Sequence, residues 1–146
     1  MEIKNFNEKR DLDFILSTFE ELHSYNIDDW KPTKLKFKKF KESIVYSKNK
    51  QKSKILVLIL EKIHVGYIQF SIYNDIDNYK ILMINKVFIL KNYRKNGYAK
   101  KLIDEANFFA NKMKCDKVAL NTFPINFELY KKLGFEIASY RMEKKV

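Results

Sequence analysis

The alternation of strand-like and helix-like segments along the 146-residue chain predicts a domain of the α/β or α+β class, with a mixed sheet. Apolar residues recur at helical spacing in several stretches, and short runs of β-branched and aromatic residues lie between them. The sequence contains no internal repeat and no change of composition that would mark a boundary. We therefore expect residues 1–146 to form a single domain.

The first third of the chain is expected to contain a short strand and two helices. Ile3 opens the strand, and Asp11 is expected to cap a helix that continues to about Ser24. A second amphipathic stretch follows over residues 35–45. The lysine-rich segment 48–54 is interpreted as a solvated linker.

Three successive strands are predicted for the middle of the chain. They cover residues 55–60, 64–73 and 79–90, and a turn cluster at residues 74–78 separates the last two. The pair Asn85-Lys86 interrupts the third strand. Two polar residues inside a buried strand indicate a β-bulge or a functional opening.

The last third continues the alternation of helix and strand. A helix with one apolar face ends near Met113, and a strand follows over residues 117–122. Pro124 is expected to begin a short helix that Gly134 stops. Residues 135–142 then form a final predicted strand.

Composition narrows the classes of function. The net charge is +11, but only three of the 29 basic residues are arginines, the residue that phosphate and base recognition favours. Nucleic acid is therefore not the expected partner. The polar N-terminus and the short apolar runs predict a cytoplasmic protein without a membrane segment. One cysteine and two histidines predict neither a disulfide nor a metal site.

The segment from Arg94 to Ala99 carries the clearest functional pattern. It lies between a predicted strand and a predicted helix, where unpaired backbone N–H groups favour a phosphate group. Gly97 and Ala99 are small enough to allow close approach, and Lys95 and Lys100 add positive charge. A tight turn that merely contains a glycine is the alternative reading.

Two stretches, Ile84 to Leu102 and Leu129 to Phe135, resemble the GNAT family of N-acetyltransferases. Arg94 to Ala99 matches the acetyl-CoA motif of that family, Arg/Gln-x-x-Gly-x-Gly/Ala, and Tyr130 to Phe135 matches its Tyr-x-x-x-Gly-Phe. The resemblance implies a central mixed, mostly antiparallel β-sheet flanked by about four helices. It also implies an N-acetyltransferase domain that transfers an acetyl group from acetyl-CoA to a primary amine in a ternary complex.

The resemblance also implies roles for single residues. Tyr130 would protonate the leaving CoA thiolate as general acid, or alternatively only pack beneath the following turn. The strand backbone would pair with the pantetheine arm, one of its amides would face the thioester carbonyl, and the loop would hold the pyrophosphate. The implied cofactor-binding residues are Val87, Phe88, Ile89, Arg94, Lys95, Asn96, Gly97, Tyr98, Ala99 and Lys100.

The chain departs from the family at the general base, because Asn85 stands where many relatives have a glutamate. Three residues, Asp28, Asp29 and Trp30, fall where the family forms its acceptor pocket. Their carboxylates could attract an ammonium group and the indole could stack on it; an acidic helix cap with an apolar plug is the simpler reading, and we favour it.

Two other functions are compatible with the sequence. An RNA- or ribosome-associated acyltransferase or binder is the first alternative, and a CoA-binding module with weak catalysis is the second. A homodimer is compatible with the expected sheet, which often pairs through its edge or C-terminal strands in this family. The expected acceptor is a primary amine of a small molecule or peptide.

Overall fold

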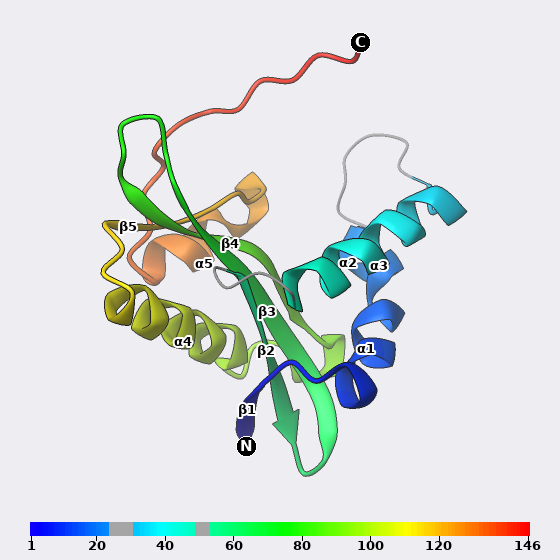
Figure 1. Cartoon of the computed structure of the whole chain (residues 1–146). Coiled ribbons are helices and arrows are strands. Elements are labelled where there is room, and N and C mark those ends of the chain that lie inside the picture. The colour runs from blue at the N-terminus through cyan, green and yellow to red at the C-terminus, as the bar shows by residue number, and fades with distance from the viewer. Residues whose placement is uncertain (24–30, 49–52) are drawn as a thin grey trace.

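The computed structural model of the chain describes residues 1–23, 31–48 and 53–146. Five strands form one sheet, in the order in which they occur along the chain (Figure 1). The first four are antiparallel neighbours, and the fifth joins the fourth in parallel. The strands are β1 (Glu2–Asn5), β2 (Ser53–Leu60), β3 (Ile63–Asn74), β4 (Lys80–Ile89) and β5 (Lys117–Leu120).

Helices cover both faces of this sheet. Figure 1 shows α1, α2 and α3 on one side and α4 and α5 on the other. None of the helices in the described ranges is long and apolar enough to span a bilayer. The helices are α1 (Glu8–Ser17), α2 (Phe19–His23), α3 (Lys34–Lys48), α4 (Tyr98–Lys112) and α5 (Phe127–Lys132), with 3-10 turns η1 (Lys91–Tyr93) and η2 (Pro124–Asn126).

The expected mixed, mostly antiparallel sheet is therefore confirmed, with five α-helices in the described residues in place of about four. The extra helix arises at Thr18, where the first predicted helix divides. The buried Thr18 hydroxyl donates to the Ile15 carbonyl at 2.7 Å and bonds the Tyr67 hydroxyl at 2.9 Å. Burial raises the pKa of Tyr67 to about 12, so this contact is between two neutral groups.

The start of α1 differs from the expectation. Asn7, and not Asp11, caps the helix, and its side chain accepts from the backbone N–H of Arg10 at 3.1 Å. Asp11 is fully buried inside the helix. It accepts hydrogen bonds from the Arg10 guanidinium at 2.6 and 2.7 Å and pairs with His64 of β3 at 2.9 Å. The carboxylate therefore ties α1 to the sheet, which a local capping pattern does not reveal.

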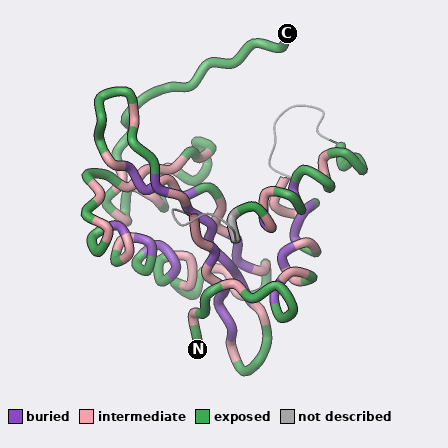
Figure 2. The backbone as a smooth tube through the Cα atoms, in the orientation of Figure 1, coloured by how far each residue is buried: buried purple, intermediate pink, exposed green. Residues whose placement is uncertain are grey.

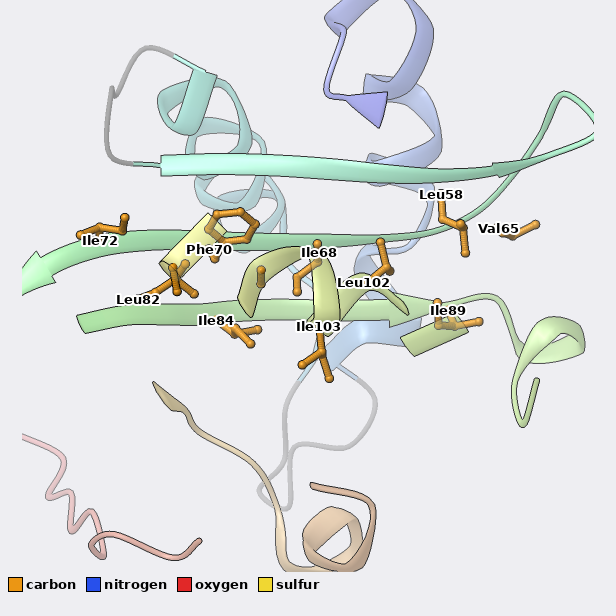
Figure 3. Packing of buried hydrophobic residues seen from close by; sticks show 12 residues of the cluster. Leu58, Val65, Ile68, Phe70, Ile72, Leu82, Ile84, Ile89, Leu102 and Ile103 are labelled. Carbon is orange, nitrogen blue, oxygen red and sulfur yellow. The ribbon is translucent and has the colours of Figure 1, made fainter. Parts of the chain in front are cut away.

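Two apolar cores lie on the two faces of the sheet. Figure 2 shows the buried residues concentrated on the central strands and the inner sides of the helices. The core beneath α4 contains Leu58, Val65, Ile68, Phe70, Ile72, Leu82, Ile84, Ile89, Leu102, Ile103, Ala106 and Ala110 (Figure 3). The core beneath α1 to α3 contains Ile15, Phe19, Phe40, Ile44, Ile55, Val57, Ile59, Tyr67 and Phe88.

The predicted strand over residues 135–142 does not form. After the left-handed turn at Gly134, with φ of 90°, the chain leaves the sheet in an extended course toward the C-terminus (Figure 1). Tyr140 is 83% exposed and Met142 is 93% exposed. A strand requires a partner for its backbone groups, and within the described residues this segment has none.

The predicted interruption of the third strand is a β-bulge. Across β3 and β4, Phe70 pairs with Ile84 and Gln69 pairs with Lys86, so Asn85 is the additional residue. Bulges bend a strand and redirect its side chains. The bulge thus separates the first half of β4 from the half that leads to the loop at residues 94–97.

Gly66 brings β3 unusually close to the end of β4. A Cβ atom added at this position would lie 2.5 Å from both the Phe88 carbonyl oxygen and the Ile89 Cδ1 atom. Gly66→Ala is therefore expected to lower the free energy of unfolding by about 1–3 kcal/mol, measured by urea denaturation. Adding Ile89→Val removes one of the two collisions and should recover part of the loss. An unchanged unfolding midpoint for Gly66→Ala would contradict this packing.

The Asp11 carboxylate should make stability depend on pH. Burial alone would raise the pKa of Asp11, but hydrogen bonds from Arg10, Asn7 and His64 bring the pKa below its usual value. A pKa that is lower in the folded state means that the charged carboxylate stabilises the fold above about pH 4. This stabilisation is lost as the pH falls through the folded pKa.

Asp11→Asn is accordingly expected to cost about 1–3 kcal/mol at neutral pH, with the difference from wild type shrinking below about pH 4. Urea unfolding over a pH series measures both effects. Asp13→Asn, at an exposed position of the same helix, serves as the control. A pH-independent difference would show that the charge of Asp11 does not contribute.

Candidate active site

The C-terminal half of β4 has an open edge. β5 pairs with β4 only from Ile81 to Ile84, whereas β4 continues to Ile89. No other described strand takes the place of β5 along the remainder. Apart from the Ile89 carbonyl, which accepts from the Arg94 side chain at 2.8 Å, the outward backbone groups of this stretch are therefore available to a ligand.

The alternation of the strand decides which residues face this edge. Leu90 donates its N–H to the Val65 carbonyl of β3 at 2.8 Å. Since neighbouring residues of a strand direct their backbone groups to opposite sides, Val87 and Ile89 direct theirs away from β3. Phe88 points its carbonyl at β3 and its ring into the core beneath α1 to α3.

The bulge at Asn85 lies where the open edge begins. Its side chain is exposed and donates to the Ser71 hydroxyl at 3.1 Å. An amide of this kind does not act as a base at neutral pH. The position that the family resemblance associates with a general base therefore shapes the strand and carries no titratable group.

The loop after β4 ends in a helix N-terminus without a side-chain cap. Lys95 and Gly97 have left-handed φ values of 63° and 76°, and α4 begins at Tyr98. The first helical bond runs from the Lys101 N–H to the Gly97 carbonyl at 3.1 Å. The preceding N–H groups of the first turn therefore have no helical acceptor.

The side chain of Asn96 stiffens this loop. Its amide donates to the Tyr93 carbonyl at 3.2 Å and to the Arg94 carbonyl at 3.1 Å. The first turn of α4 contains no acidic residue, and Lys100 pairs with Asp104 one turn later at 2.6 Å. The loop thus presents fixed N–H donors and positive charge, the properties that a phosphate group requires.

Arg94 directs its side chain back into the protein. Its Nε donates to the Ile89 carbonyl at 2.8 Å, and its Nη2 pairs with Glu21 of α2 at 2.6 Å. The guanidinium also lies 5.9 Å from the centroid of the Phe88 ring. The side chain therefore connects α2 to the end of β4, which leaves the backbone of the loop as the part that faces outward.

Tyr130 lies on α5, on the same face of the sheet as α4. Its ring packs edge-to-face with Phe135 at 5.9 Å, and the Phe135 N–H bonds the Tyr130 carbonyl across the Gly134 turn. Burial raises the pKa of Tyr130, so its phenol remains protonated at neutral pH. Its hydroxyl bonds no other residue of the described ranges.

Not every sequence-predicted residue can be placed. Asp28, Asp29 and Trp30 lie outside the described residues. Conversely, sequence reasoning missed the half-buried Lys86, whose ammonium group lies against the Phe40 ring of α3 at 5.0 Å. The interruption of an apolar strand by a lysine was the available signal, but its environment depends on the position of α3.

Residues 51–137, more than half of the chain, match the family model described as an acetyltransferase (GNAT) domain. Among curated proteins, none is similar to the chain at a significant level. The solved structures provide the wider comparison, and the fold recurs in many of them.

A transcriptional regulator from Bacillus halodurans superimposes with a TM-score of 0.79 at 18% identity, covering 99% of both chains. The aminoglycoside N-acetyltransferase AAC(6')-Iy, bound to a CoA-based bisubstrate analogue, gives 0.75 at 20% identity, covering 99% of this chain and 97% of the other. An acetyltransferase from Trypanosoma brucei gives 0.70 at 19% identity, covering 99% of both chains. At these identities the superpositions establish a shared fold.

Arg94 and Lys95 should respond differently to truncation. Arg94→Ala removes the bond to Ile89 and the ion pair to Glu21, and is expected to lower the free energy of unfolding by about 1–3 kcal/mol. The neighbouring Lys95→Ala removes an exposed ammonium and should leave stability within about 0.5 kcal/mol. Denaturant unfolding of the ligand-free protein measures both. Equal effects would contradict the structural role of the Arg94 side chain.

Proposed function

Because this chain belongs to the GNAT acetyltransferase family, we propose that it is an acetyl-CoA-dependent N-acetyltransferase acting on a primary amine of a small molecule or peptide. The observation that supports this best is the open edge of β4, which residues 90–97 connect to an uncapped helix N-terminus. The strand edge offers backbone groups to an amide-containing arm, and the helix N-terminus offers N–H donors to a pyrophosphate.

The donor would be held chiefly by backbone groups. In this proposal Val87 and Ile89 pair with the pantetheine amides as a missing strand would, with Phe88 setting their position. The loop from Arg94 to Ala99, continued by Lys100, receives the pyrophosphate on the first-turn N–H groups of α4. Crystal structures of AAC(6')-Iy, a structural neighbour, hold CoA or a CoA-based analogue, which is consistent with this assignment.

The bound donor supplies an acetyl group activated as a thioester. In the proposed reaction the amine attacks the carbonyl carbon, a C–N bond forms and the C–S bond breaks. A backbone N–H on the open edge of β4 would stabilise the negative charge that develops on the carbonyl oxygen. One fixed donor of this kind contributes about 3 kcal/mol.

Tyr130 is the proposed general acid. Its burial keeps the phenol protonated, and its hydroxyl has no acceptor among the described residues, so the proton is available to the departing thiolate. The amine must attack in its neutral form, and Asn85 cannot take its proton. We therefore assign deprotonation of the ammonium to water at the site.

Tyr130→Phe tests this assignment. The variant keeps the ring and its packing against Phe135, so CoA binding should be unchanged while kcat falls by about 100-fold or more. Release of thiol from acetyl-CoA in the presence of a panel of primary amines measures turnover, and calorimetric titration with CoA measures binding.

The matched control is Tyr140→Phe, since Tyr140 is 83% exposed and lies in the C-terminal segment. This variant should turn over at the wild-type rate. Wild-type turnover in Tyr130→Phe would refute the general-acid role. Tight CoA binding by the wild-type protein without transfer to any amine would instead favour a CoA-binding module.

A further inference from the structure

A cavity of about 290 Å³ lies between α2, α3 and β4. It opens on the face of the sheet opposite α4 and is continuous with the core beneath α1 to α3. Three lysines, Lys36, Lys39 and Lys86, contribute to its wall, and no acidic residue of the described ranges does. A small cavity with this charge favours an anionic ligand.

Lys86 is the central cation of this cavity. Its ammonium group donates to the Gln69 amide oxygen at 3.0 Å and to the Ser43 hydroxyl at 3.3 Å, both of which are neutral. It forms no ion pair with any residue that the structure describes. Burial lowers the pKa of Lys86 to about 8, so at neutral pH most molecules hold a charge that lacks a counter-ion.

The two lysines of α3 add charge at the rim. Lys39 is exposed and has no ionic partner among the described residues. Lys36 donates to the Lys31 carbonyl at 2.8 Å. Lys38, by contrast, is paired with Glu42 at 3.9 Å and does not contribute to the cavity wall.

The remainder of the wall is aromatic. Phe19 of α2 and Phe40 of α3 pack with a centroid distance of 5.2 Å, and His23 lies against both rings. The Nδ1 atom of His23 bonds the Phe19 carbonyl at 2.7 Å and must be the donor, because a carbonyl only accepts. The cavity therefore combines a cationic end with an apolar body.

We propose that this cavity binds the acceptor through a carboxylate, so that the preferred substrate is a small primary amine that carries a negative charge. The proposal rests on the acetyltransferase function proposed above. Lys86 directly precedes Val87, whose backbone faces the open edge of β4, so an acceptor anchored there has its amine beside the donor site. The cations that the structure describes in the cavity wall are lysines, and the single charge of the half-buried Lys86 is balanced by one carboxylate.

The same charge disfavours polycationic acceptors. AAC(6')-Iy shares the fold and acts on aminoglycosides, as its name states. An acceptor with several ammonium groups would bring positive charges close to Lys39 and Lys86. The resulting repulsion would weaken the binding of polycationic acceptors. The two proteins are therefore expected to differ in the charge of their acceptors.

The test compares two amines that differ in one charge, 4-(aminomethyl)benzoate and 4-(aminomethyl)benzamide. In the thiol-release assay the wild-type kcat/KM should be at least 10-fold higher for the benzoate. Lys86→Met and Lys39→Met should each bring this ratio toward one. Lys41→Met, which removes an exposed lysine of α3 outside the cavity wall, is the matched control and should keep the ratio.

A ratio near one in the wild type, or an unchanged ratio in both cavity variants, would overturn the proposal. Lys39 is exposed, so its variant remains informative if Lys86→Met does not fold. A binding measurement tests the anion site even if the protein acetylates no amine. Without turnover of any amine, NMR titration with benzoate should still shift the signals of Ser43 and Lys86, and titration with benzamide should not; equal responses would refute the anion site.

Discussion

The separation of β4 from β5 after Ile84 is the constraint on which the site depends. Four residues of parallel pairing hold the two strands together, and the bulge at Asn85 then changes the course of β4. Beyond that point β3 is the one strand of the described residues that pairs with β4, and Gly66 permits their close approach. The second half of β4 therefore has an open backbone edge, although β4 lies between two strands of the sheet.

The candidate site residues around this part of β4 lie on both faces of the sheet. The open edge leads through residues 90–97 to the N–H groups of α4, and the protonated phenol of Tyr130 lies on the same face of the sheet as α4. On the other face, Lys86 projects beneath α3 into a cavity with a cationic end. The side chains of the adjacent residues Lys86 and Val87 therefore point to opposite faces of the sheet, because successive side chains alternate across a strand.

Features that depend on neighbouring residues could be predicted from the sequence, and features that depend on distant contacts could not. The turn at residues 74–78, the stop at Gly134 and the bulge at Asn85 each follow from local residue preferences. The cap at Asn7 was missed because Asp11 is satisfied by His64, 53 residues away. The predicted strand over residues 135–142 failed because its pattern says nothing about whether a partner edge is present.

The candidate site divides in the same way. The loop from Arg94 to Ala99 and Tyr130 could be proposed from the sequence because each lies in a short motif, and their roles stay predictions. The inward course of the Arg94 side chain and the cavity around Lys86 arise only when α2 and α3 pack on the sheet. Residue type alone therefore does not show that the Arg94 side chain turns to Glu21 or that the Lys86 side chain lines a cavity.

The contact between Arg94 and Glu21 has a thermodynamic consequence. It joins the loop after β4 to α2, and α2 also supplies Phe19 and His23 to the cavity wall. Ordering one of these elements by a ligand therefore changes the free energy of ordering the other. By reciprocity, occupation of either site alters the affinity of the other by the same factor. In the proposed ternary complex, the Arg94–Glu21 ion pair is thus one contact that couples donor binding to acceptor binding.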